Sequence, residues 1–429
     1  MKPFLTLLAA ATTSVIALST SALAETVLLT ADAMVDVEAG TLVEGPGILI
    51  EDGKVVSVGQ LAAMSVPQGT ETIDLEGMTI MPGMIDMHVH LMGDSGNHGY
   101  KALGVSAHSD TIHGVVNAQT TLMAGYTTVR NVGAGGFSDV ALRDAIAEGV
   151  VPGPRLFVSG PAIGITGGHC SDNNLLPPEY EAVGEGVADG PWAARAKVRN
   201  NIKYGTDLIK TCSTGGVLSK GTKVGAPQYS LEELTALTEE AHSHGLKVAS
   251  HAHGAEGIVN ALKAGIDTIE HASFIDDEGI RLARENGAYL AMDIYVTEYI
   301  LGEGEAAGIL PESLEKERMT GQTQRDNFQK AHEAGVKMIF GTDAGVFPHG
   351  QNARQLSRMV RFGMTEAEAL QATTVNAADA LGKSDTIGKI APGYFADIIA
   401  VEGNPLEDIS VLEDVGFVMK EGKVYKGGN

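Results

Sequence analysis

Six residues with side chains that can serve as metal ligands recur at one kind of position, the end of a short apolar run. They are His88 and His90 in PGMIDMHVH, Lys210 in DLIKTCSTGG, His251 in VASHAHG, His271 in TIEHAS and Asp343 in FGTDAG. Each run is typical of a buried strand followed by a turn. Parallel α/β barrels gather the carboxyl ends of their strands on one face, where distant side chains can meet around metal ions. The set predicts a two-metal site.

The histidine spacing carries the metal hypothesis. Side chains two residues apart on a strand point to the same side, so His88 and His90 can hold one ion. A single pair of this kind is more often incidental, but a metal needs three or four donors, and the later strand ends supply them. Six of the 13 histidines lie at or just after a predicted strand end. These are His88, His90, His169, His251, His253 and His271.

Lys210 allows two interpretations. Divalent cations would repel its ammonium group, and lysine is rarely buried without a partner. Carboxylation of the amine by carbon dioxide would instead give an anionic carbamate whose two oxygens can bridge two metal ions. Alternatively, the side chain extends along apolar surface and places its ammonium group in solvent at the barrel rim.

The elements that must position these residues alternate regularly. Eight short β-rich runs alternate with amphipathic helical patterns, which predicts an α/β fold, a (β/α)8 TIM-like barrel over residues 79–385. The runs are TIMPGMIDMHVH, YTTVRNVG, PRLFVSG, DLIKTCSTG, KVASHAHG, DTIEHAS, AYLAMDIYV and KMIFGTDAG. Ser230 begins a capping-box pattern ahead of one helix. Glycines with left-handed backbone are expected to end the helices before strands, at Gly125, Gly205, Gly245, Gly265, Gly287 and Gly335.

The two chain ends differ from the middle. Residues 25–78 and 386–429 contain short alternating strands joined by Asp-Gly or Glu-Gly turns. Neither end has enough strands for a core of its own, so they are expected to pair into one small β-sandwich beside the barrel.

Residues 1–24 are predicted to be a cleavable signal peptide. Lys2 precedes an apolar run, and the segment ends in the small-residue site Ala22-Leu23-Ala24. The run is interrupted by polar residues and is shorter than the ~20 apolar residues that a membrane span needs. The chain is therefore expected in the periplasm or outside the cell, without a membrane anchor.

Composition excludes some partners. The chain has 30 basic and 54 acidic residues, a net charge of −24, which argues against nucleic acid and anionic lipid. Cys170 and Cys212 are the only cysteines, and both follow or end predicted strands. A disulfide between them is geometrically possible, but the sequence analysis favours two partly buried free thiols.

Several motifs resemble the amidohydrolase superfamily: PGMIDMHVH, the lysine of the fourth strand, GTDAG and the C-terminal run NAADALG…IGKIAPGYFADIIAVEGNPL. TGGHC, DLIKTCSTGG and SHAHG are similar to its metal-dependent carboxypeptidase and prolidase-like branch, which includes ochratoxin-hydrolysing amidases. The likeness covers nearly the whole chain after residue 24. It implies a carboxylated Lys210 and two zinc ions. It also implies the ligands: His88, His90, Lys210 and Asp343 for one ion, and Lys210, His251 and His271 for the other.

This arrangement predicts hydrolysis of an amide. Two metal ions can lower the pKa of a shared water, and Asp343 can accept its proton and pass it to the leaving nitrogen. His253 is assigned to carbonyl polarisation, with a purely orienting hydrogen bond as the alternative. His169 and Tyr229 are candidate substrate contacts, and either can be purely structural. The stretch from Thr297 to Thr320 is a candidate lid.

Three hypotheses follow. The first is a zinc hydrolase that releases a C-terminal amino acid from dipeptides or N-acyl amino acids, including ochratoxin-type aryl amides. The second is a cyclic-amide hydrolase or deaminase of the same superfamily, against which Lys210 argues because such deaminases use one metal. The third is an exported binding protein without turnover, against which Asp343 argues as a proton carrier. A small-molecule substrate and a homo-oligomer are expected in the first case.

Overall fold

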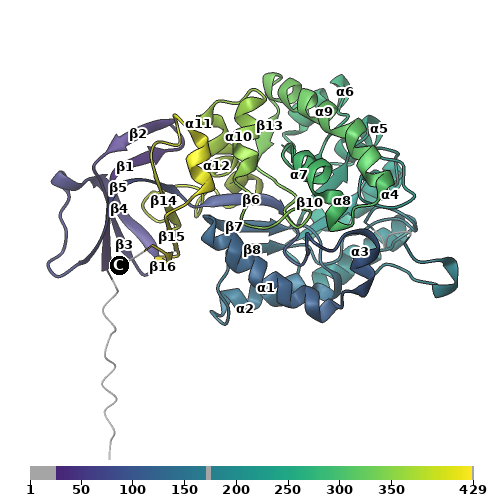
Figure 1. Ribbon diagram of the computed structural model, residues 1–429, viewed down its shortest axis with the longest axis horizontal. Coiled ribbons are helices and arrows are strands. Elements are labelled where there is room, and N and C mark those ends of the chain that lie inside the picture. The colour runs from purple at the N-terminus through teal and green to yellow at the C-terminus, as the bar shows by residue number, and fades with distance from the viewer. Residues whose placement is uncertain (1–25, 171–174, 428–429) are drawn as a thin grey trace, which may run out of the picture.

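A computed structural model describes residues 26–170 and 175–427. The predicted signal peptide, residues 1–24, lies outside the described residues. The chain builds a layer of strands from its two ends and, next to it, a larger α/β body from its middle (Figure 1).

All eight strands predicted for the middle of the chain are present and parallel to their neighbours. They are β6 (Met84–Val89), β7 (Tyr126–Asn131), β8 (Arg155–Val158), β9 (Leu208–Cys212), β10 (Lys247–Ala252), β11 (Thr268–His271), β12 (Tyr289–Ala291) and β13 (Lys337–Ile339). Strands β9 to β13 form a five-stranded sheet and β6 to β8 a three-stranded sheet, in sequence order. Single parallel bridges, Val89↔Ala344 and Ile163↔Thr211, join the two sheets just beyond their outer strands. The arrangement is barrel-like, and chain order equals strand order.

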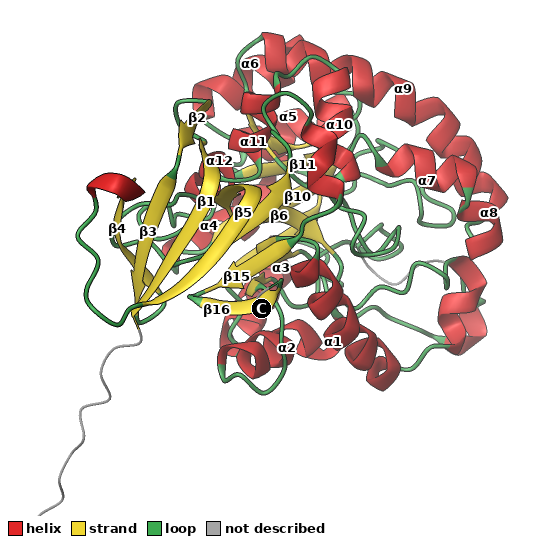
Figure 2. Cartoon of the chain, turned by 60° about the vertical axis from the view of Figure 1, so that its left-hand side comes forward, coloured by secondary structure: helices red, strands yellow, loops and turns green. Residues whose placement is uncertain are grey.

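Helices surround these strands (Figure 2). The α-helices are α1 (Ala107–Met123), α2 (Ser138–Ala147), α3 (Pro191–Lys203), α4 (Leu231–Ser243), α5 (Ala255–Lys263), α6 (Asp277–Asn286), α7 (Val296–Gly302), α8 (Gly304–Ala307), α9 (Pro311–Glu333), α10 (Arg354–Arg361), α11 (Glu366–Ala372) and α12 (Val375–Ala380). Short 3-10 helices are η1 (Leu61–Ala63), η2 (Gly99–Gly104), η3 (Gly135–Phe137), η4 (Pro178–Tyr180) and η5 (Ile409–Glu413). In the part of the chain that the structure describes, no helix is both long and apolar enough to cross a membrane.

The predicted helix boundaries are confirmed where local chemistry fixes them. The Ser230 side chain accepts from the Glu233 backbone N–H, while the Glu233 carboxylate accepts from the Ser230 N–H, a complete capping box at the start of α4. The six glycines predicted to end helices all have positive φ, from 68° at Gly287 to 93° at Gly125.

One apolar core holds the strands against the helices. Each of the eight parallel strands contributes a buried aliphatic or methionine side chain to the same cluster: Val89, Val129, Val158, Ile209, Val248, Ile269, Leu290 and Met338. Because the strands are covered on both faces, their residues are buried almost without interruption, as expected for a parallel sheet. This leaves the strand ends as the places where polar side chains can gather.

The chain ends share one sheet. Its strands are β1 (Thr26–Asp36), β2 (Thr41–Glu44), β3 (Pro46–Glu51), β4 (Lys54–Gln60), β5 (Glu71–Pro82), β14 (Ile398–Glu402), β15 (Phe417–Lys420) and β16 (Lys423–Lys426). Strand β14 pairs with β5, which joins the C-terminal strands to the N-terminal ones. The hydrogen-bonded order is continuous, β16-β15-β14-β5-β1-β3-β4 with β2 beside β1, so the described strands form one sheet rather than the two sheets of the expected sandwich.

Candidate metal centre

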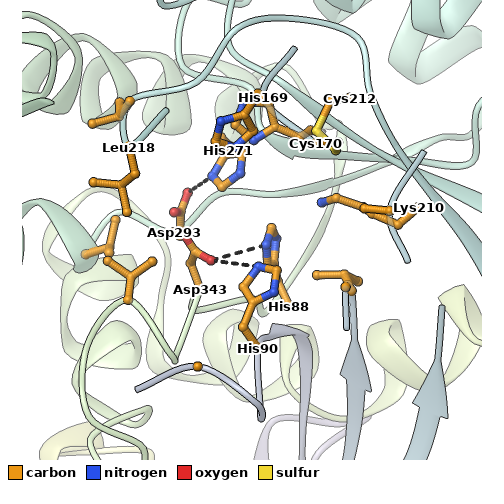
Figure 3. A pocket seen from close by; sticks show the side chains of 18 of the residues that line it. His88, His90, His169, Cys170, Lys210, Cys212, Leu218, His271, Asp293 and Asp343 are labelled. Atoms are coloured by element: carbon orange, nitrogen blue, oxygen red, sulfur yellow. Dashed lines mark hydrogen bonds and ion pairs between the residues drawn. A yellow bond between two sulfur atoms is a disulfide. The ribbon is translucent and has the colours of Figure 1, made fainter. Parts of the chain in front are cut away.

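The six predicted ligands converge. His88, His90, Lys210, His251, His271 and Asp343 all line one cavity of about 600 Å³. They come from the ends of β6, β9, β10, β11 and the turn after β13, so the cavity lies at the carboxyl ends of the parallel strands. Figure 3 shows five of these side chains, His88, His90, Lys210, His271 and Asp343, directed toward a common space. The convergence is what the parallel arrangement predicts.

One donor group surrounds Asp343. Its Oδ1 lies 3.4 Å from His88 Nε2 and 3.2 Å from His90 Nε2 (Figure 3). Donor atoms of His88, His271 and Asp343 lie within 4.8 Å of one another, close enough to share an ion. Burial raises the pKa of Asp343, but the hydrogen bond from His90 and the electrostatic interactions with the neighbouring histidines outweigh it and hold that pKa well below its usual range. Burial also lowers the pKa of His88 to about 4, which keeps its imidazole neutral, the form that binds metal.

A second donor group lies next to the first. Donor atoms of His251, His253 and His271 are within 4.8 Å of one another. His271 belongs to both groups, and its ring centroid is 4.5 Å from that of His251 and 5.0 Å from that of His88. The Nε2 atom of His251 is buried and has no hydrogen-bond partner among the described residues. Burial holds the pKa of His251 well below its usual range, so a neutral, unpartnered nitrogen is available to a cation.

Lys210 does not place its amine in solvent. Its residue is 3% exposed, and the buried Nζ has no hydrogen-bond partner among the described residues. The alternative in which the side chain reaches the rim is therefore wrong. Burial lowers the pKa of the Lys210 amine to about 8, which favours the uncharged, nucleophilic form that carbon dioxide can carboxylate. An unpartnered amine beside two groups of metal donors fits a carbamate that bridges two divalent cations.

A buried ionic network orients His88. Its Nδ1 lies 2.9 Å from Glu270 Oε2, which leaves Nε2 directed toward Asp343. Arg130 donates to the other Glu270 oxygen at 2.7 Å and to the Met87 carbonyl at 2.6 Å. Burial alone would raise the pKa of Glu270, but Arg130 and His88 hold it well below its usual range, so the carboxylate is ionised. Such partners fix both tautomer and ring orientation of a metal-binding histidine.

The other histidines are held in the same way. His271 Nδ1 lies 2.9 Å from Asp293 Oδ1, and Gln324 on α9 donates to that oxygen at 2.7 Å. His253 Nδ1 lies 2.7 Å from the Ser273 hydroxyl. In each case one ring nitrogen is occupied by the protein and the other is left for the cavity.

These supporting residues were not among those predicted from the sequence. Glu270 and Arg130 each lie inside a strand whose residues are all buried, where a charged residue needs a partner. A charged residue in a buried strand could have been noticed in the sequence. That Arg130 on β7 pairs with Glu270 on β11 could not have been predicted from it. Asp293 and Gln324 carry no comparable signal, because their role depends on where the β12 turn and α9 lie.

Two ligand positions have left-handed backbone. The φ of His271 is 70° and that of Asp343 is 61°. Such conformations cost about 1 to 3 kcal/mol for residues other than glycine and persist where the surroundings fix them. Asp86 supplies part of that fixation after β13, because its carboxylate accepts from the Thr342 hydroxyl at 2.6 Å and from Asn352 at 2.8 Å. The turns thus direct both side chains into the cavity.

The two predicted substrate contacts have different positions. His169 lines the cavity, its ring centroid 4.0 Å from that of His251, and its Nδ1 lies 2.9 Å from the Ser219 hydroxyl. Tyr229 does not line the cavity: it is 2% exposed, and its hydroxyl donates to the Ala188 carbonyl at 2.7 Å. Tyr229 therefore has a structural role and not the expected substrate contact, because its side-chain hydroxyl forms a hydrogen bond in the core.

Cys170 and Cys212 form a disulfide, with Cα atoms 5.7 Å apart. The preference for free thiols was wrong, because the loop after β8 passes directly over the end of β9, a proximity that sequence cannot fix. The bridge ties the residue after His169 to the strand that carries Lys210. It also excludes Cys212 as a thiolate ligand, although its sulfur lies near donor atoms of His169 and His251.

Known proteins resemble this chain over most of its length. The profile of the amidohydrolase family matches residues 79–425. An ochratoxinase of Aspergillus niger is 34% identical over 420 residues, covering 91% of this chain and 86% of the relative. A solved structure of a Xaa-Pro dipeptidase with bound methionine in the active site superposes with a TM-score of 0.87 at 38% identity, covering 94% of this chain and all of the other. A prolidase complexed with N-methylphosphonate-L-proline superposes with a TM-score of 0.86 at 30% identity, covering 94% of this chain and 100% of that one.

Glu270→Gln should weaken metal binding about 10- to 100-fold, because His88 loses the charge that fixes its orientation and Arg130 loses its buried partner. Metal affinity is measured by competition with a chelator. Glu278→Gln is the matched control, since Glu278 is exposed on α6 and pairs with Arg281. Unchanged affinity in Glu270→Gln would contradict the orienting role.

Replacing both Cys170 and Cys212 by serine should lower the free energy of unfolding by about 2 to 4 kcal/mol, because the bridge restricts the unfolded chain. Denaturant titration measures the change. Wild-type protein under dithiothreitol serves as the control and should unfold like the double variant. Detection of two free thiols in unreduced, denatured wild-type protein would show that no bridge forms.

Proposed function

The chain belongs to the amidohydrolase family and is a hydrolase that acts on C–N bonds, and from this premise we propose that it is a binuclear zinc enzyme. It releases the C-terminal amino acid from dipeptides or N-acyl amino acids. The observation that carries the proposal is the convergence of five histidine and aspartate donors on a buried lysine amine without a hydrogen-bond partner.

The donor set divides between two ions. We assign one to His88, His90, Lys210 and Asp343, and the other to Lys210, His251 and His271, with Lys210 carboxylated and shared. When bound, the ions would lower the pKa of a shared water and polarise the amide carbonyl. The neutral imidazoles of His88 and His251 and the ionised Asp343 suit this task, because each of these three offers a lone pair without first losing a proton.

Asp343 is the proposed proton carrier. Its carboxylate lies between His88 and His90 and lines the cavity, so it can accept a proton from the attacking water and deliver it to the leaving nitrogen. An amine leaves readily only when it is protonated. Asp343 therefore both holds a cation and moves a proton.

His253 is proposed to polarise the scissile carbonyl. Burial holds its pKa well below the usual range, and Ser273 occupies its Nδ1. The ring is thus a neutral group of fixed orientation at the cavity wall, suited to a developing oxyanion if Nε2 carries the proton. His169 is proposed to contact the substrate carboxylate. Its ring stacks on that of His251, and the His251 ring also meets that of His253 edge to face.

The relatives support the substrate class. Their names describe an ochratoxinase and a Xaa-Pro dipeptidase, and the dipeptidase structure holds an amino acid, methionine, in its active site. A cavity of about 600 Å³ is of the size that holds small-molecule ligands. Dipeptides, N-acyl amino acids and aryl amides of the ochratoxin type fall in this range.

Three further points are part of the proposal. The bridges Val89↔Ala344 and Ile163↔Thr211 support closure of the eight strands into a (β/α)8 barrel over residues 79–385, with residues 25–78 and 386–429 as the second domain. The Cys170–Cys212 disulfide supports export by residues 1–24 to an oxidising compartment. Symmetric homo-oligomerisation remains a prediction from the fold class.

A substrate screen tests the function. Protein loaded with zinc in the presence of bicarbonate should release free amino acid from dipeptides or N-acyl amino acids, measured by amine detection and by mass of the products. Chelator-treated protein is the control and should release none. Protein with two bound zinc ions that hydrolyses no member of the panel would contradict the proposal and favour a binding protein.

Lys210→Ala should lose metal and activity, because the bridging anion is removed. Short-chain carboxylic acids should restore part of both, since a small carboxylate can occupy the vacated space. Metal content and amino acid release are measured on the same preparations, with the exposed Lys383→Ala as the matched control. A fully metallated and active Lys210→Ala protein would refute the bridging role.

A further inference from the structure

One carboxyl group in the cavity wall has no part in the proposed chemistry. Glu317 on α9 is 3% exposed and lines the same cavity as the histidines. The hydroxyl of Thr297 on α7 donates to its Oε1. No lysine, arginine or histidine forms an ion pair with Glu317 in the described segments of the chain; the nearby charges of Arg325 and His271 lower its pKa, but burial outweighs them. Burying a carboxylate in this way is costly unless something else provides the positive charge.

The cations nearest in sequence are occupied elsewhere. Lys316 donates to the Ser219 carbonyl at 2.7 Å, away from the cavity wall that Glu317 forms. The Arg325 guanidinium contacts the Ile294 carbonyl and Glu298. Burial raises the pKa of the Glu317 carboxyl to about 7, and a cation placed beside it would favour the ionised form. The site therefore suits a positively charged ligand group.

Glu317 lies at a defined position relative to the metal centre. It lines the cavity together with Gln324, seven residues further along the same helix, and Gln324 contacts the Asp293 carboxylate that orients His271. Seven residues correspond to roughly 10 Å along a helix. Both side chains therefore reach the cavity from α9, and the Glu317 carboxyl is close enough to Asp293 and His271 for their charges to affect its pKa.

Part of the cavity wall is apolar. Val217 and Leu218, in the loop after β9, and Val296 and Ile300, on α7, line the cavity. Methylene groups of a long basic side chain pack well on such a surface while the charged end reaches a polar partner. Within residues 26–170 and 175–427, Lys210 is the one lysine or arginine that lines the cavity, and the Arg325 guanidinium forms its hydrogen bonds with the Ile294 carbonyl and Glu298 rather than with Glu317.

We propose that Glu317 is a specificity-determining residue that selects substrates whose released amino acid is arginine or lysine. The carboxylate receives the guanidinium or ammonium group, and the side chain's methylenes lie along Val296 and Ile300. This assignment rests on the proposed function and narrows its substrate class.

Arginine and citrulline provide the test, because their side chains have nearly the same shape but only arginine is charged. Wild-type enzyme should hydrolyse N-acetyl-L-arginine about 10- to 100-fold more efficiently, in kcat/KM, than N-acetyl-L-citrulline. Glu317→Gln should bring the ratio of the two kcat/KM values close to one. Glu315→Gln is the matched control: Glu315 is exposed on the same helix, contacts Arg318, and should leave the ratio as in wild type.

Calorimetric binding of free arginine and free citrulline measures the same selection without turnover. Tighter binding of arginine to the wild type, lost in Glu317→Gln, supports the proposal even where neither amide is cleaved; absence of cleavage would count against the proposed function alone. Equal binding and equal cleavage of the two by wild type overturns the proposal. Equal losses for both substrates in Glu317→Gln also overturn it, because they assign Glu317 only a structural bond to Thr297.

Discussion

Burial of polar side chains at the carboxyl ends of the strands is the constraint on which the site depends. Burial keeps His88 and His251 neutral, the form in which an imidazole binds metal, and lowers the pKa of the Lys210 amine to about 8. The same burial would destabilise isolated charges. Buried ion pairs, such as that of Glu270 with Arg130, compensate for this cost in place of solvent.

Those pairs connect the fold to the chemistry. Glu270 belongs to β11, the strand that also carries His271, yet it orients His88 on β6 from across the strands. Arg130 on β7 completes the connection through the Met87 carbonyl. One buried network therefore sets the relative positions of three strands and the direction of a ligand ring. Stability and metal geometry depend on the same few hydrogen bonds.

Features that depend on local sequence pattern could be predicted from the sequence. The eight strands, the capping box at Ser230 and the helix-ending glycines follow from periodicity and backbone preference, and the ligand positions follow from strand ends. Contacts between distant segments were not predictable: the Cys170–Cys212 bridge and the burial of the Tyr229 hydroxyl against Ala188 depend on loop paths. The expected sandwich also failed, because alternation identifies strands but not how they are ordered within a sheet.

The parallel strands divide into sheets of three and five, and a proposed ion would connect the two sheets. His88 and His90 extend from the smaller sheet, whereas Lys210, His251 and His271 extend from the larger, and single bridges join the two. An ion held by residues of both sheets fastens this seam from within. If the ions bind as proposed, metal occupancy and the rigidity of this seam would be thermodynamically linked, because a cation that binds only the folded protein stabilises it.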